Sequence, residues 1–286
     1  MKQLLVLSGK GGTGKTTVAT ALIKLSKAKI YADCDVDAPN LHLLMEGGEE
    51  PKKSNYYGLP KGKINDELCV RCHKCVDKCR FEAIKFDKKY VIDPYACEGC
   101  GVCQIVCKNG AITLEDDVAG NLMLYTENRV FSTAKLKMGS GTTGKLVTEV
   151  KNQMKKSSND EALAIIDGSP GIGCPVIASL NGANMVLVVA EPSISGISDM
   201  ERIIETARSF QVKIAVCVNK FNTNIDKTKE IERFCVNNNL PFIGKIPFDY
   251  KAVEAINNGF SVVDVECASG DSIKEIFEKT IKILYE

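Results

Sequence analysis

Short runs of apolar residues recur along the chain and predict the strands of a sheet. They cover residues 4–7, 29–32, 162–167, 185–190, 214–218 and 243–247. Continuous apolar runs of this length are typical of parallel strands that are buried on both faces. Apolar positions at helical spacing predict helices at residues 18–25, 197–210, 225–237, 250–257 and 272–284. This alternation predicts an α/β fold, with a mostly parallel sheet and helices on both of its faces.

The middle of the chain departs from this pattern. Residues 47–62 are rich in Gly, Glu, Pro, Lys, Ser and Asn, which predicts a linker. Residues 122–125 and 129–132 predict two short strands. Between these segments lies a cysteine-rich block with a repeat of its own, so we expect an insertion within the α/β domain.

A phosphate-binding motif follows the first predicted strand directly. Residues 9–17 read Gly-Lys-Gly-Gly-Thr-Gly-Lys-Thr-Thr and match the P-loop pattern in full, with a helix after it. Glycines let successive backbone N–H groups point at phosphate oxygens, and the helix N-terminus adds its positive dipole end. We therefore expect ATP or ADP on this loop, with Lys15 on the β- and γ-phosphates and Thr16 on Mg²⁺. The remaining nucleotide-binding positions are Gly11, Gly12, Thr13, Gly14 and Thr17.

Two further strands end in carboxylates. Asp167 closes the apolar run 162–167, the position of a Walker B aspartate, and is expected to hold Mg²⁺. Asp33, Asp35 and Asp37 follow the predicted strand at 29–32. Ligands collect at the carboxyl ends of the strands in open α/β sheets, so these side chains should face the phosphates. Asp33 and Asp37 could instead be ordinary caps or turn residues.

The cysteines are the unusual part of the composition. Thirteen occur in 286 residues, an odd number, and disulfides are improbable in a long chain without an export signal. Eight of them form two C-x-x-C-x-x-C-x-x-x-C runs that repeat with a period of 28 residues. This is the spacing of bacterial [4Fe-4S] runs, in which the fourth cysteine serves the other cluster. One cluster is thus assigned to Cys69, Cys72, Cys75 and Cys107, and the other to Cys97, Cys100, Cys103 and Cys79.

Zinc is the competing interpretation of these cysteines, because C-x-x-C pairs also build tetrahedral zinc sites. Two intact tandem runs favour iron. Proline usually follows the fourth cysteine, whereas Arg80 and Lys108 stand there in this chain. We hypothesise that these cations lie near the sulfurs and raise the reduction potentials.

Composition and charge narrow the functional class. Lys and Arg number 37 against 36 Asp and Glu, and this near-zero balance argues against a nucleic-acid partner. No apolar run approaches the roughly 20 residues that cross a bilayer, and the N-terminal run is too short for a signal peptide. A cytoplasmic protein without a membrane partner is expected. Hydrophobic residues make up 44% of the chain, enough for a sizeable core.

The loop at residues 10–17 resembles the deviant Walker A loop of MinD/ParA/nitrogenase-iron-protein ATPases. The resemblance implies that Lys10 reaches a partner subunit's nucleotide, so that the ATP-bound form is a homodimer. It also implies that Asp35 positions the attacking water, that Gly171 senses the γ-phosphate and that Asn219 contacts adenine. Pro247, at the end of the last predicted strand, is expected to pack against the base.

The chain as a whole resembles the ferredoxin-containing MinD superfamily ATPases, which are related to Mrp-type iron-sulfur carriers. This implies an ATPase domain at residues 1–55 and 118–286, and an inserted bacterial-type ferredoxin (α+β) domain with two [4Fe-4S] clusters at residues 60–117. The expected function is ATP-driven electron transfer to a partner metalloprotein. The alternative is an ATPase that carries clusters to apo-proteins, so the client is either a redox or an iron-sulfur protein.

Two features remain outside this assignment. Residues 139–145 mimic a phosphate loop, but Leu146 stands where the Mg²⁺-binding hydroxyl should be and no clear buried strand precedes the loop. A turn that leads into a helix at residues 146–154 is expected there, facing the insert or a partner. Cys174 follows the Gly171 segment, where it is either a small buried hydrophobe or a thiol that nucleotide state could move.

Overall fold

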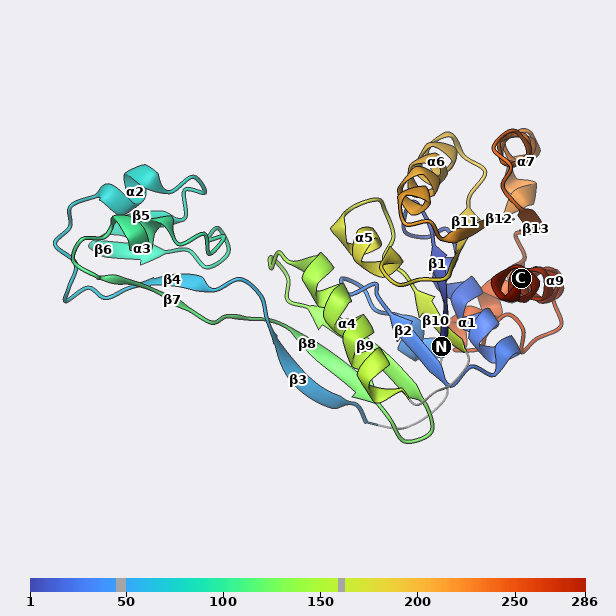
Figure 1. The fold of residues 1–286 in the computed structure, drawn as a ribbon, viewed down its shortest axis with the longest axis horizontal. Helices are drawn as coiled ribbons and strands as arrows, with labels where there is room; N and C mark the ends of the chain where they lie inside the picture. Colours follow the sequence, from blue (N-terminus) through green and yellow to red (C-terminus); the bar gives the residue numbers. More distant parts are fainter. Residues whose placement is uncertain (45–49, 159–162) are drawn as a thin grey trace.

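The computed structural model describes residues 1–44, 50–158 and 163–286. A nine-stranded sheet forms its centre (Figure 1). From one edge to the other the strands are β13 (Phe242–Ile246), β12 (Lys213–Asn219), β11 (Met185–Ala190), β1 (Lys2–Leu7), β10 (Leu163–Asp167), β2 (Ile30–Asp33), β9 (Val130–Leu136), β8 (Val118–Tyr125) and β3 (Lys52–Tyr57). All neighbouring strands from β13 to β9 pair in parallel, whereas β8 pairs antiparallel with both β9 and β3. The predicted α/β fold with a mostly parallel sheet is confirmed.

Helices cover both faces of the sheet because alternate strand residues point to opposite sides. In β1, Leu5 and Leu7 join one buried cluster, while Leu4 and Val6 join the other. The first cluster is completed by α4 (Thr143–Ser157), α5 (Cys174–Leu180), α6 (Ile194–Ser209) and α7 (Ile225–Asn237). The second is completed by α1 (Lys15–Ser26), α8 (Tyr250–Asn257) and α9 (Ala268–Tyr285). The predicted helices are confirmed with small differences at their ends.

The linker predicted at residues 47–62 is wrong for the residues that the structure describes, while residues 47–49 lie outside them. Here β3 adds an antiparallel edge strand to the central sheet. The next strand, β4 (Lys61–Ile64), belongs to a separate two-stranded sheet. The polar composition misled the interpretation because β3 is largely exposed, with Tyr56 its one buried residue. An edge strand next to solvent tolerates polar residues at most positions.

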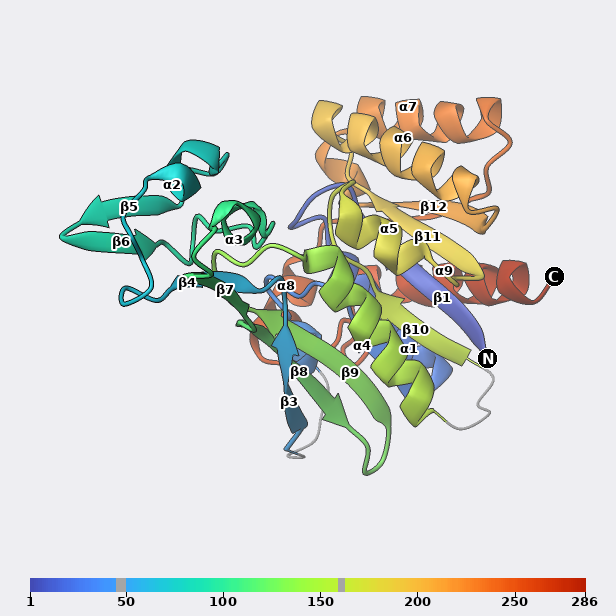
Figure 2. The ribbon, with the colours of Figure 1, turned by 60° about the vertical axis from the view of Figure 1, so that its left-hand side comes forward.

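Residues between β3 and β8 form a lobe beside the main sheet (Figures 1 and 2). Strand β4 pairs with β7 (Ile112–Glu115), and β5 (Ile84–Asp87) pairs with β6 (Lys89–Ile92). The helices α2 (Lys74–Lys78) and α3 (Val102–Val106) lie 28 positions apart, as do β5 and β7. The repeat in the sequence is therefore a repeat of structure.

Two short 3₁₀ segments complete the described elements, η1 (Leu41–Leu44) and η2 (Phe221–Thr223). Strands β1, β2, β10, β11 and β12 all end at the same edge of the sheet, because they are parallel and neighbouring. The loops that follow them meet there and form the site described below. Among the described residues, no helix has the length and apolar character needed to cross a membrane.

Candidate functional site

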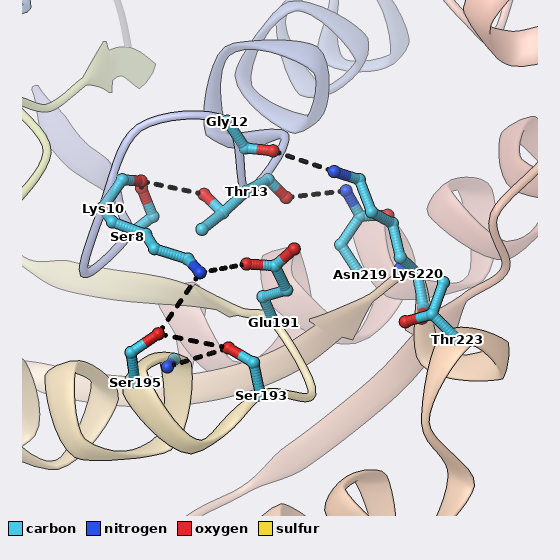
Figure 3. Close-up of polar contacts among 11 residues, drawn as sticks. Ser8, Lys10, Gly12, Thr13, Glu191, Ser193, Ser195, Asn219, Lys220 and Thr223 are labelled. Carbon is cyan, nitrogen blue, oxygen red and sulfur yellow. Dashed lines mark hydrogen bonds and ion pairs between the residues drawn. The ribbon is translucent and has the colours of Figure 1, made fainter.

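The loop between β1 and α1 is curled by left-handed glycines. Gly12 has a φ of 79° and Gly14 a φ of 90°, conformations that other residues adopt only with strain. Asn219 donates from Nδ2 to the carbonyl oxygen of Thr13 at 2.7 Å, and Lys220 donates from Nζ to that of Gly12 at 2.9 Å (Figure 3). Hydrogen bonds from the last residue of β12 and from the residue that follows it thus hold the loop in place.

Lys15, Thr16 and Asp167 meet beneath the loop. Lys15 Nζ lies 2.5 Å from Asp167 Oδ1, and Thr16 donates from Oγ1 to Asp167 Oδ2 at 2.7 Å. Burial alone would lower the pKa of Lys15, but the charge of Asp167 and the hydrogen bond to it outweigh burial and raise that pKa. A hydroxyl and a carboxylate oxygen at one point are ligands of the kind that Mg²⁺ prefers. Thr16 and Asp167, the predicted Mg²⁺ ligands, are therefore neighbours. To bind the metal, Asp167 would have to give up its ion pair with Lys15.

Asp33, the last residue of β2, and Asp35, which follows the strand, have different surroundings. Asp33 is fully buried and accepts hydrogen bonds from the backbone N–H groups of Asp35 at 3.0 Å and Leu41 at 3.1 Å. Burial and the charge of Asp167 raise the pKa of Asp33 to about 7. Asp35 is partly exposed, and burial raises its pKa against the opposing effect of Lys15. Asp33 therefore shapes the loop, whereas the carboxylate of Asp35 is partly exposed and accepts a hydrogen bond from the backbone N–H of Ala38.

The segment after Asp167 is attached to the end of β1. The backbone N–H of Gly171 donates to the carbonyl oxygen of Ser8 at 3.1 Å, and Gly171 has a φ of 95°. Ser169 donates from its hydroxyl to the carbonyl oxygen of Cys34. The N–H group that is expected to sense a γ-phosphate is thus engaged inside the protein and would have to change partners.

A cavity of about 200 Å³ extends from the glycine loop toward the C-terminal helices. Gly12, Gly14 and Asn219 line its entrance side, together with Pro247. The cavity is largely apolar, with walls that include Val18, Val253, Ile256, Val262 and Ile273. Asn219 and Pro247 therefore share one cavity with the phosphate loop, as a purine pocket requires.

The side chain of Lys10, which is not among the residues that line this cavity, reaches toward Glu191 and the start of α6 (Figure 3). Its Nζ lies 2.7 Å from Glu191 Oε2 and 3.4 Å from the hydroxyl of Ser195. The Lys10 side chain is 39% exposed. Within this single chain, the lysine expected to act on a partner's nucleotide is held by a carboxylate that follows β11.

The eight lobe cysteines line two separate cavities. Cys69, Cys72, Cys75 and Cys107 line one of them, and Cys79, Cys97, Cys100 and Cys103 line the other. This division is the one that the crossed assignment requires. Cys72 and Cys100 are exposed and Cys97 is buried. Burial raises the pKa of Cys75 and of Cys103, the third cysteines of the two runs, so a metal has to displace a proton from each.

In the described parts of the chain, no three His, Cys, Asp or Glu side chains are placed to hold a single metal ion. Arg80 and Lys108 are exposed and line neither cavity, so the geometry offers no support for their tuning the sulfurs.

Sequence reasoning missed several residues of the site. Glu191 and Ser195 were not assigned to Lys10, and Lys220 was not assigned to the loop. Their signals were weak: Glu191 stands directly after a predicted strand, and Lys220 directly after Asn219. Phe248 and Val253 of the cavity carried no signal, because they come from a loop and a helix that the sequence does not place near the glycines.

Comparison with known proteins identifies related chains. A model described as the CobQ/CobB/MinD/ParA nucleotide binding domain matches residues 4–262. A protein of Methanocaldococcus jannaschii is 34% identical and matches across 97% of this chain and 95% of its own length. An iron-sulfur cluster carrier protein of Pyrococcus horikoshii is 23% identical over 99% of this chain and 87% of its own. The septum site-determining protein MinD of P. horikoshii, solved with Mg-ADP, has a similar fold: the TM-score is 0.59 at 17% identity, covering 99% of this chain and 96% of that one.

Proposed function

The chain belongs to the CobQ/CobB/MinD/ParA nucleotide-binding domain family, and from this premise we propose that it is a P-loop ATPase that couples its nucleotide cycle to electron transfer through two [4Fe-4S] clusters. Residues 1–55 and 118–286 form the ATPase domain in this proposal, and residues 60–117 form the inserted ferredoxin domain. One observation carries the proposal: two cavities lined by four cysteines each share a chain with a curled phosphate loop.

The phosphate loop supplies the binding half of the reaction. Its backbone N–H groups would receive the β- and γ-phosphates, and Lys15 would leave Asp167 for phosphate oxygens. Thr16 and Asp167 would hold Mg²⁺, which neutralises phosphate charge when bound. The cavity bounded by Asn219 and Pro247 would take the adenine ring.

Hydrolysis requires groups on the far side of the γ-phosphate. Asp35, with its partly exposed carboxylate, would orient the attacking water. The N–H of Gly171 would exchange the carbonyl oxygen of Ser8 for the γ-phosphate, so the segment after Asp167 would report which nucleotide is bound. Lys10 of a second copy would stabilise the charge that develops on the transferred phosphoryl group. The active form is then an ATP-bound homodimer.

The cysteine lobe supplies the redox half. Each set of four thiolates would hold one cluster in the crossed arrangement, and each cluster would exchange one electron with a partner metalloprotein.

Anaerobic purification tests both halves. We expect about eight irons and eight sulfides per chain, and Mg²⁺-dependent ATP hydrolysis that Lys15→Ala abolishes. Lys24→Ala is the matched control, because Lys24 lies on the same helix and pairs with Asp264 outside the loop. Zinc in place of iron would overturn the redox half. Hydrolysis that survives Lys15→Ala would overturn the ATPase half.

Cluster delivery to apo-proteins is the second candidate, and the similarity to an iron-sulfur cluster carrier protein favours it. Four thiolates around each cluster favour retention, because a transferable cluster needs open ligation. Mixing the loaded protein with a chelator and an apo-acceptor separates the two functions. Rapid cluster loss supports the carrier, whereas retained clusters that a partner oxidises in the presence of ATP support the electron donor.

A further inference from the structure

We propose that the junction loop, residues 137–145, which connect β9 to α4 and include the first turn of α4, transmits nucleotide state from the Gly171 segment to the second cysteine run. The cluster held by Cys79, Cys97, Cys100 and Cys103 would then respond to nucleotide more strongly than the other. The inference rests on the proposed function and adds the route and the responding cluster. It also gives a role to the glycine-rich motif that resembles a phosphate loop without being one.

On the ATPase side, the junction loop contacts the helix that follows the nucleotide-sensing segment. A Cβ atom at Gly144 would lie 3.1 Å from both the Cβ and the carbonyl oxygen of Cys174. Cys174 begins α5, three residues after Gly171. Leu146 of α4 and Val176 of α5 belong to one buried cluster. Because packed helices shift together, a movement at Gly171 that displaces α5 also displaces the start of α4.

On the lobe side, the junction loop contacts the second cysteine run. A Cβ at Gly139 would lie 3.1 Å from the ring of Tyr95, and one at Gly141 would lie 3.9 Å from Glu98 Oε2. Tyr95 precedes Cys97 by two residues, and Glu98 follows it directly. The loop therefore lies against side chains of the segment that carries Cys97 and Cys100, two ligands of the second cluster.

The junction loop also holds the strand that leads into the lobe. The hydroxyl of Tyr56 lies 2.9 Å from Thr142 Oγ1, and Lys145 donates from Nζ to the carbonyl oxygen of Tyr57 at 3.3 Å. Lys145 Nζ stands 5.7 Å from the centre of the Tyr56 ring. Figure 1 shows the chain before α4 on the side of that helix that faces the lobe. The loop thus contacts the lobe and its connecting strand at once, so its position sets that of the second run.

This route departs from the one that chain order suggests. Residues 34–41, which include Asp35, precede the inserted lobe in the sequence. However, β3 comes between them along the chain, and β3 lies at an edge of the sheet, five strands away from β1. A true coupling is reciprocal: reduction of the cluster must change nucleotide affinity by the same factor as nucleotide changes the reduction equilibrium.

Redox titration of the loaded protein tests the proposal. Midpoints of both clusters are measured by EPR with Mg-ADP and with a non-hydrolysable ATP analogue, and the signals are assigned with Cys72→Ser and Cys100→Ser. We expect the midpoint of the second cluster to shift between nucleotides and that of the first to shift less. Tyr95→Ala should remove the shift without loss of iron. Tyr285→Ala, an exposed tyrosine at the end of α9, should preserve it.

A second pair of variants tests the ATPase end of the route. Gly144→Ala should push α4 away from Cys174 and reduce the shift, whereas Gly141→Ala has room and should preserve it. Hydrogen exchange in residues 94–101 of the loaded protein, with each nucleotide, provides a readout that does not depend on the EPR signals. Equal shifts in both clusters, a shift that survives Tyr95→Ala, or identical exchange with both nucleotides would overturn the inference. Absence of iron or of nucleotide binding would instead overturn the proposed function.

Discussion

Replacing Glu191 by glutamine should strengthen ATP-dependent dimer formation. In the single chain, Glu191 holds the amino group of Lys10 at 2.7 Å, with Ser195 as a weaker neighbour at 3.4 Å. In the proposed ATP-bound dimer, Lys10 would have to leave this contact to reach the partner's nucleotide. Breaking the ion pair would then be a cost of dimerisation. Glu191→Gln removes the charge of the pair while keeping the size of the side chain.

The magnitude follows from the exposure of the pair. The side chains are 39% and 23% exposed, and ion pairs near the surface contribute about 0.5–1 kcal/mol. A symmetric dimer breaks two such pairs, which gives about 1–2 kcal/mol. The dimer Kd of the variant should fall by about 5- to 30-fold. The difference in dimer Kd between the variant and the unmodified protein should narrow as ionic strength rises, because salt screens the Lys10–Glu191 ion pair.

Sedimentation equilibrium with Mg²⁺ and a non-hydrolysable ATP analogue measures this Kd. Glu201→Gln is the matched control, because Glu201 is an exposed carboxylate farther along α6. Lys10→Ala should abolish the gain that Glu191→Gln produces. An unchanged or weaker dimer in Glu191→Gln would refute the reasoning and would mean that Glu191 itself contributes to the dimer.

Three further predictions follow from the geometry. Between pH 6 and pH 8 the nucleotide-free protein should lose about 1 kcal/mol of unfolding free energy, since burial raises the pKa of Asp33 to about 7 and the folded state alone keeps that proton at pH 6. Asp33→Asn should flatten this dependence in urea titrations at the two pH values. Gly14→Ala should abolish nucleotide binding in calorimetry, because its Cβ would lie 2.1 Å from Asn219 Nδ2 at a φ of 90°. Cys107→Ser should alter the same EPR signal as Cys72→Ser, and a separate signal for each would contradict the crossed arrangement.

The sequence by itself determined the parts whose signals are local. The phosphate loop, Asp167 and the eight cysteines were found because their chemistry requires fixed spacing along a short segment. The central strands were found because a parallel strand covered on both faces must be apolar throughout. Strand β3 of the central sheet was missed because it is an edge strand, which carries no such requirement.

The tertiary structure alone decided how these parts meet. The contact of Lys10 with Glu191 joins residues 181 positions apart. Gly139 lies against Tyr95, which belongs to a different loop. The strand that leads into residues 139–145 also escaped prediction at its full length: β9 runs to Leu136. Spacing in a sequence reports what neighbours along the chain can do together. Contacts between distant segments depend on strand order and helix packing, which many different sequences could satisfy, so only the folded chain fixes them.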